Sequence, residues 1–189
     1  MNAIPPIRLT VDEFLRWSLE QESGRYELEQ GRIVKMQSEN IRHTTTKRRV
    51  VDALSTAIER AGVPYYALPD GPTVRIDDDR AYEPDALIAP LPMPSLDALE
   101  IPDPIAVFEV LSPSPTSVKR DLTTKLHGYA RVPSIQHYVV IDPAERTVFR
   151  FRRHADELVA TEELTEGVLR LDPPGLDVPV ADMLTPVES

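Results

Sequence analysis

The run from Ile105 to Leu111 constrains the fold more than any other segment of the chain. It is apolar except for Glu109, and the sequence Ser-Pro-Ser-Pro at 112–115 ends it. A nearly continuous apolar run of this length, closed by prolines, is typical of a buried central strand of a sheet. Because side chains alternate along a strand, Glu109 shares a face with Val107 and Leu111. A carboxylate therefore stands in a row that should be buried, which is costly for a lone charge.

The spacing of apolar residues predicts the elements around this strand. Thr10 and Glu13 form a capping-box pattern that begins a short helix, and Gly62 ends a second helix that starts at about residue 44. A third helix is predicted from about 117 to 131, and the proline-rich residues 89–104 are expected to form an ordered surface loop. Strands are predicted at 25–29, 32–36, 65–68, 73–76, 84–88, 135–141 and 147–153, with short edge strands between 158 and 180. This order predicts one α/β or α+β domain over residues 1–189, with a core over about 8–185.

Composition excludes several classes of protein. The chain of 189 residues has no cysteine, so disulfide-stapled scaffolds, thiolate zinc sites and cysteine nucleophiles are excluded, and we expect a cytoplasmic protein. Residues 1–10 contain no basic leader, and no apolar stretch approaches the length of a membrane span. With only 7 glycines and no glycine-rich phosphate loop, no nucleotide cofactor is expected.

The charge balance is acidic, with 31 Asp and Glu against 21 Lys and Arg and a formal net charge of -10. A nucleic acid would therefore have to meet a local basic patch rather than a broad basic coat. The candidate patches are the basic clusters at 47–49 and 150–154, although most clusters of this kind are simply solvated faces.

Two further charged residues break the apolar pattern. Asp85 precedes the apolar residues 86–88 on another candidate core strand. On a helical wheel of about 100° per residue, Lys125 falls within the apolar stripe of Leu122, Leu126 and Tyr129, whereas Arg120, Thr124 and His127 fall on the solvent side. Lys125 is therefore predicted to point toward the sheet, near the two acids.

Two carboxylates and a lysine that converge on a partly buried point allow two interpretations. A hard divalent cation, Mg²⁺ or Mn²⁺, could bind between Asp85 and Glu109, and Lys125 could hold or deprotonate a metal-bound water. Alternatively, Glu109 and Lys125 form a structural ion pair and Asp85 caps a turn. The pattern alone leaves both open.

An ordered set of motifs over about residues 8–185 resembles the Uma2 family of the PD-(D/E)xK restriction-endonuclease-like superfamily. The motifs are Tyr-Glu-Leu-Glu-Gln-Gly at 26–31, His43 at a helix start, Glu-Pro-Asp at 83–85, Phe-Glu-Val-Leu-Ser-Pro-Ser at 108–114, Asp121 to Lys125 with Tyr129, and His-Tyr-Val-Val-Ile-Asp-Pro at 137–143. The resemblance implies a restriction-endonuclease-like mixed β-sheet flanked by helices, and a metal-dependent phosphodiesterase that acts on DNA.

By this resemblance Asp85 and Glu109 are the metal-binding acids, and Glu27 matches the early acid of the family as a candidate third carboxylate. Leu111 stands where the superfamily pattern has lysine, and Lys125 matches the position from which Uma2-like proteins supply it. An exposed hairpin position explains Glu27 equally well. The competing function is a non-catalytic module of the same fold that binds nucleic acid or protein. Paired cleavage of a duplex calls for two active sites, so a homodimer is expected, through the 89–104 loop or an edge strand.

Three other residues are not expected to take part in catalysis directly. His43 near a helix start is expected to be a cap or a surface residue, and Tyr129 is expected to pack against the sheet, where it could orient Lys125. Ser112 is followed by proline and has no histidine in a convincing relation to it, so a serine hydrolase is not expected.

Overall fold

The computed structural model describes residues 8–184, apart from the side chains of residues 115–117. Its helices are α1 (Val11–Leu19), α2 (Ile41–Ala61), α3 (Pro115–Arg120), α4 (Leu126–Ala130) and α5 (Val180–Met183), with a π-helical segment, η1 (Asp121–Lys125), between α3 and α4. Its strands are β1 (Tyr26–Glu29), β2 (Arg32–Lys35), β3 (Tyr65–Pro69), β4 (Val74–Asp77), β5 (Arg80–Tyr82), β6 (Ala86–Pro90), β7 (Ala106–Val110), β8 (His137–Asp142), β9 (Thr147–His154), β10 (Glu157–Leu164), β11 (Val168–Leu171) and β12 (Leu176–Pro179).

The main sheet has six strands in the order β10-β9-β8-β7-β6-β3, and β7 lies inside it, as its apolar sequence predicts. The β7–β8 pair is parallel and every other pair in this sheet is antiparallel, so the sheet is mixed. A parallel pair needs a crossover between its strands, and α3, η1 and α4 form it. This crossover carries Lys125 over the sheet.

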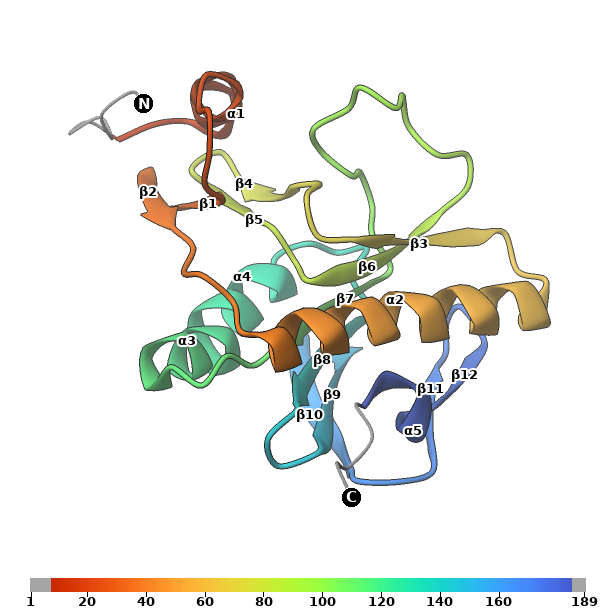
Figure 1. The fold of residues 1–189 in the computed structure, drawn as a ribbon. Helices are drawn as coiled ribbons and strands as arrows, with labels where there is room; N and C mark the ends of the chain where they lie inside the picture. Colours follow the sequence, from red (N-terminus) through yellow and green to blue (C-terminus); the bar gives the residue numbers. More distant parts are fainter. Residues whose placement is uncertain (1–7, 185–189) are drawn as a thin grey trace.

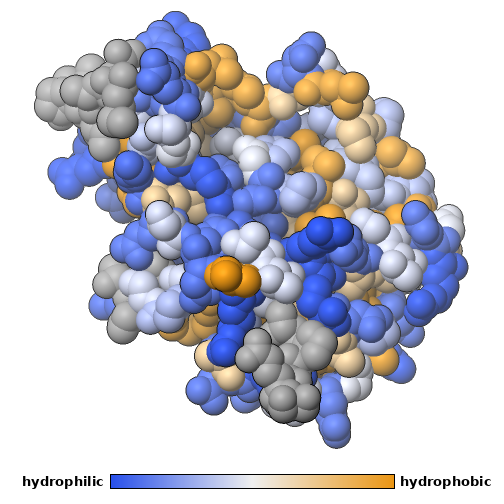
Figure 2. All heavy atoms as spheres, viewed as in Figure 1, coloured by the Kyte–Doolittle hydropathy of each residue, from blue (hydrophilic) through white to orange (hydrophobic). Residues whose placement is uncertain are grey.

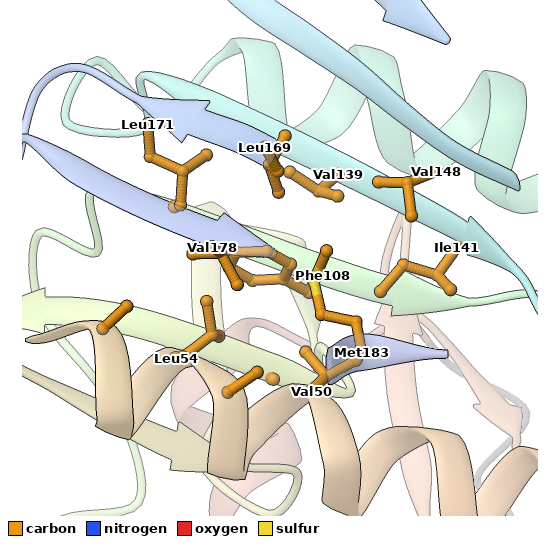
Figure 3. Close-up of a cluster of buried hydrophobic side chains, with 14 of the residues drawn as sticks. Val50, Leu54, Phe108, Val139, Ile141, Val148, Leu169, Leu171, Val178 and Met183 are labelled. Carbon is orange, nitrogen blue, oxygen red and sulfur yellow. The ribbon is translucent and has the colours of Figure 1, made fainter. Parts of the chain in front are cut away.

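The two faces of the main sheet are covered differently (Figure 1). Helix α2 packs on one face together with β11, β12 and α5, where its side chains Val50 and Leu54 point toward Phe108 on β7, as Figure 3 shows. On the opposite face, Val107 and Leu111 pack in a cluster with Tyr129 and with partly buried residues of the crossover. Glu109 belongs to this second face by alternation along the strand.

A second sheet, β2-β1-β5-β4, lies beside the first and is antiparallel throughout. Helix α1 packs against it through Val11 and Phe14, and the predicted capping box is present, since Thr10 and Glu13 cap each other. The short strand β5 is not among the strands expected from the sequence, and neither is the sheet that it completes, which brings Glu27 to the centre. The α+β class and the mixed sheet flanked by helices are confirmed.

The predicted ends of α2 are close to those observed. The helix begins three residues earlier than predicted, after the N-cap Asn40, whose side chain accepts from the His43 N–H at 2.9 Å, and it ends at Gly62 in the left-handed conformation. Among the described helices, none combines the length and the apolar character that crossing a bilayer requires.

Candidate active site

The pairing of β6 with β7 brings Asp85 and Glu109 to one place. In this antiparallel pair Ala86 lies opposite Phe108, so the residue before β6 meets the residue after Phe108. The Asp85 N–H donates to the Phe108 carbonyl at 3.0 Å, and the Val110 N–H donates to Asp85 Oδ2 at 2.8 Å. Both carboxylates are buried. The register of two strands therefore positions the acids that the sequence singled out.

Lys125 comes from the crossover and reaches the same point. Its side chain is only 2% exposed, and its Nζ lies 2.8 Å from Glu109 Oε2 and 3.0 Å from Glu27 Oε1. The Tyr129 hydroxyl donates to Glu109 Oε1 at 2.9 Å. The inward orientation that the helical wheel predicts for Lys125 is correct. Tyr129 packs in the core, as predicted, and also binds the catalytic candidate Glu109 directly.

Glu27 is not an exposed hairpin residue. Its side chain is 0% exposed, and its Oε1 accepts from the Glu83 N–H at 2.9 Å. It also forms an ion pair with Arg120. The prediction that Arg120 faces solvent on the far side of the helix is wrong. The π-helical turn that follows Arg120 changes the angular spacing of side chains, so a wheel of uniform α-helical pitch misplaces residues around the turn.

Burial and charge act against each other on these acids. Burial raises the pKa of Glu109 well above its ordinary value, although Lys125 opposes the shift. Burial likewise raises the pKa of Asp85 against the nearby cations, and it raises the pKa of Asp121 to about 6. Burial would also raise the pKa of Glu27, but Lys125 and Arg120 hold it below its ordinary value. Burial therefore favours the protonated forms of Glu109, Asp85 and Asp121, whereas Glu27 is held ionised by its two cations.

Sequence reasoning missed a second charged cluster that adjoins this site through Asp85. The Nζ of Lys47 lies 2.6 Å from Glu39 Oε2, 2.7 Å from Asp70 Oδ2 and 3.6 Å from Asp85 Oδ1. Arg25 binds Glu39, Asp70 and Glu83.

Lys47 was predicted as part of a patch for phosphates and is instead buried, as is His43, which was expected to be a cap or a surface residue. A signal existed in the sequence: positions 43 and 47 extend the apolar stripe of Val50, Leu54 and Ala57 at steps of three and four.

The second predicted basic patch is also structural. Arg150 donates to the Arg170 carbonyl, Arg152 donates to the Asp172 carbonyl at 2.9 Å, and Arg153 donates to several carbonyls that include that of Ile135 at 2.6 Å. These guanidinium groups, all from β9, bind β11 and the turn that follows it, and the segment between α4 and β8. Their backbone contacts explain a basic cluster in an acidic protein without a polyanion.

The acids line a pocket of about 180 Å³. Asp85, Glu109, Asp121 and Lys125 all contribute to its wall. A larger hollow of about 910 Å³ adjoins it, because Glu39, His43 and Ser112 line both. The pocket is therefore continuous with the larger hollow and forms its acidic end.

The donor set suits a divalent cation. Asp85 uses Oδ2 for the Val110 N–H, which leaves Oδ1 available, and each Glu109 oxygen accepts one hydrogen bond and keeps a lone pair. The four buried acids Glu27, Asp85, Glu109 and Asp121 outnumber the three cations that face them, which are Lys125, Arg120 and, at 3.6 Å from Asp85, Lys47. Carboxylates in excess of buried cations are what Mg²⁺ or Mn²⁺ would neutralise.

The arrangement of sheets and helices defines a nuclease-like fold. It is similar to the solved structure of a putative nuclease belonging to DUF820 from Anabaena variabilis, with a TM-score of 0.68 and 20% sequence identity. The match covers 93% of this chain and 97% of that chain. At this identity the likeness establishes the fold alone.

The sequence itself matches the model of the Uma2 family, described as "Putative restriction endonuclease", over residues 11–181. The chain belongs to the Uma2 family, and the resemblance seen in its motifs is confirmed. No curated protein matches the chain by sequence.

Proposed function

We propose that this protein is a metal-dependent endonuclease that hydrolyses phosphodiester bonds in DNA. One observation carries the proposal: the Lys125 ammonium lies 2.8 Å from Glu109 in the pocket that Asp85 also lines. Three segments distant in sequence bring these side chains together: the residue before β6, the end of β7, and η1. Membership of a family described as "Putative restriction endonuclease" supports the same activity.

Asp85 and Glu109 would hold the cation, Mg²⁺ or in its place Mn²⁺. When bound, such an ion polarises a phosphate and lowers the pKa of a water molecule. Glu27 acts through Lys125, since its carboxylate lies 3.0 Å from Nζ and the Glu83 N–H fixes it in place. Glu27 is therefore a positioning residue rather than a metal ligand in this proposal.

Lys125 would contribute a fixed positive charge. An ammonium that donates to Glu109 and lies in an ion pair with Glu27 has no lone pair with which to take a proton from water. We therefore assign it the task of holding the attacking water and stabilising the charge that develops on the phosphate. Tyr129 orients Glu109 by donating to its second oxygen.

The DNA backbone would meet cations at the rims of the two hollows rather than the predicted basic clusters. Lys35 borders the acidic pocket, and Arg42 and Lys119 border the larger hollow. All three residues are exposed. A small set of cations is consistent with binding by an acidic protein.

We further propose that the protein acts as a homodimer, because cleavage of both strands of a duplex requires two sites. The loop between β6 and β7 offers the contact surface, with Leu91, Met93 and Leu96 exposed. Figure 2 shows apolar residues gathered at the upper right, where Figure 1 places this loop. Light scattering at increasing concentration tests this: a constant mass of 21.2 kDa would contradict it.

A non-catalytic module is the competing function, and one observation favours it: both oxygens of Glu109 already have protein donors. A structural ion-pair network would look the same without a metal. In a nuclease, changing Asp85 or Glu109 to its amide removes a metal ligand and therefore DNA cleavage. In a non-catalytic module there is no cleavage to lose.

The deciding experiment is a cleavage assay on supercoiled plasmid and on single-stranded DNA with Mg²⁺, with Mn²⁺ and with EDTA. We expect cleavage only with the ions, and we expect Asp85→Asn to abolish it while the control Asp156→Asn, at an exposed position in the β9–β10 turn, retains it. Cleavage in EDTA would contradict metal dependence. A parent protein that binds DNA without cutting it under any of these conditions would establish the non-catalytic module.

A further inference from the structure

Glu39, His43 and Asp85 form a second group of metal-ligand type next to the acidic pocket. One ligand atom from each residue lies within 4.8 Å of the other two. Glu39 lies just before the N-cap of α2, His43 lies in the first turn of that helix, and Asp85 precedes β6. All three residues also line the acidic pocket. Two carboxylates and an imidazole thus face one another at the starts of α2 and β6.

The hydrogen bond of His43 determines which ring nitrogen is free. Its Nε2 lies 2.6 Å from the Val110 carbonyl, and because a carbonyl only accepts, Nε2 carries the hydrogen. In the neutral ring Nδ1 then has a lone pair. This nitrogen makes no hydrogen bond among the described residues, although His43 is only 5% exposed.

Nδ1 is directed at another acceptor. Glu39 Oε2 lies 3.4 Å from it, so a lone pair and a carboxylate oxygen face each other in a buried place. The Lys47 ammonium, 2.6 Å from Glu39 Oε2, neutralises the carboxylate but donates nothing to the Nδ1 lone pair, which stays unpaired in a buried place. Either a proton on Nδ1 or a metal ion with both atoms as ligands resolves it.

The acidic side chains in and around the cluster outnumber the basic ones, so a divalent ion would be stabilised there. Glu39, Asp70, Glu83 and Asp85 are opposed by two cations, Arg25 and Lys47. Lys47 does not saturate Asp85, since its Nζ stays 3.6 Å from Asp85 Oδ1. It fixes the Glu39 carboxylate instead, as does Arg25. The two basic residues therefore orient the cluster and leave an excess of negative charge.

We propose that Glu39, His43 and Asp85 form a second cation site, which takes a first-row transition ion through an imidazole nitrogen and two carboxylates. Imidazole favours such ions over Mg²⁺, which prefers oxygen ligands. Because Asp85 belongs to both sites, this inference rests on the proposed function for the role of Asp85. The two ions would share that carboxylate, as in enzymes that use paired metals on one phosphate.

Calorimetric titration of the metal-free protein with Co²⁺ tests the site without an activity assay, and the visible spectrum of Co²⁺ reports its nitrogen ligand. We expect the parent to bind a pair of ions, and His43→Gln to bind one ion fewer with the spectrum changed. Glutamine retains a donor for the Val110 carbonyl. Glu39→Gln should have the same effect if His43→Gln does not fold, and the exposed control His127→Gln should match the parent.

The shared carboxylate gives the pattern that separates this site from the catalytic one. Glu109→Gln should lose one ion and keep the spectrum of the nitrogen-ligated one, whereas Asp85→Asn should lose both. If the parent binds one ion that His43→Gln keeps and Glu109→Gln loses, the second site does not exist and the proposed function stands. If folded His43→Gln loses both ions, the two sites are not distinct. If the parent binds no ion, this proposal and metal dependence are both wrong.

Discussion

The Nζ of Lys125 lies 2.8 Å from Glu109 Oε2, and both side chains are buried between the crossover and the main sheet. Glu27 lies on the other side of the same ammonium at 3.0 Å. The lysine therefore neutralises two carboxylates that the fold has removed from water, in addition to any part it takes in chemistry.

Replacing Lys125 by Met should therefore destabilise the metal-free protein strongly. The methionine keeps the apolar stem but leaves Glu109 and Glu27 without their shared cation, a loss of about 3–5 kcal/mol for a broken buried pair. Urea unfolding in EDTA measures it, with the exposed Lys119→Met as a control. Adding Glu109→Gln to Lys125→Met should restore part of the loss. An unchanged midpoint for Lys125→Met would show that the ammonium does not neutralise these acids.

Gly128 permits the close packing that supports the catalytic candidates. A Cβ at this position would overlap the ring of Tyr82, which packs edge-on against Tyr129 at a centroid distance of 5.5 Å. Gly128→Ala should cost about 1–3 kcal/mol through overpacking. Because Tyr129 donates to Glu109, the change should also lower activity. Thr124→Ala, at an exposed position before the same helix, is the control for thermal melting and cleavage rate. Parental stability in Gly128→Ala would contradict the packing.

His137 should make stability depend on pH. Burial lowers its pKa from 6.5 to about 4, while its Nε2 donates to the Pro173 carbonyl. As pH falls below 6.5, His137 binds a proton in the unfolded chain but stays neutral in the folded chain. The contribution of neutral His137 to the free energy of unfolding is therefore fully present above pH 6.5. It is lost between pH 6.5 and 4, by about 3 kcal/mol in total.

Urea unfolding at several pH values tests this contribution. His137→Gln should flatten the decline between pH 6.5 and 4, whereas the exposed His127→Gln should keep it. An equal slope in His137→Gln and the parent would mean that other groups, such as carboxylates, account for all of the pH dependence.

The cations that meet DNA should be Arg42 and Lys119 and not the arginines of β9. Replacing Arg42 and Lys119 by Gln should weaken DNA binding and flatten its salt dependence by up to about 0.9 in log–log slope per lost phosphate contact. Neutralising Arg150, Arg152 and Arg153 should instead lower stability, since their donors hold backbone carbonyls. Fluorescence anisotropy at several salt concentrations distinguishes the two sets. A reduced salt slope only in the arginine variant would reverse the assignment.

The sequence was sufficient for features that depend on local periodicity. Alternation along β7 identified Glu109 as a charge on a buried face, and the apolar stripe of the crossover identified Lys125 as its partner. The same periodicity failed at Arg120, because the π-helical turn changes the angle per residue and nothing in the local sequence marks that turn.

Features that depend on contacts between distant segments were harder to predict. Glu27 is buried only because the second sheet, completed by the short β5, carries it against Arg120 and Lys125. Lys47 and His43 lie on the apolar stripe of α2, so the reasoning applied to Lys125 would have found them. Their partners Asp70 and Asp85 come from other elements, and no spacing along α2 predicts those contacts.

The most direct test of the central claim is to measure metal binding and DNA cleavage together in Glu109→Gln. The amide removes the charge that compensates for dehydration of the ion, and the pocket keeps its shape. We predict that Glu109→Gln loses the Mg²⁺-dependent heat seen in the parent and that its cleavage of plasmid DNA falls to the level in EDTA. Glu109→Gln that binds Mg²⁺ and cuts DNA as the parent does would show that Glu109 is not a ligand of the catalytic ion.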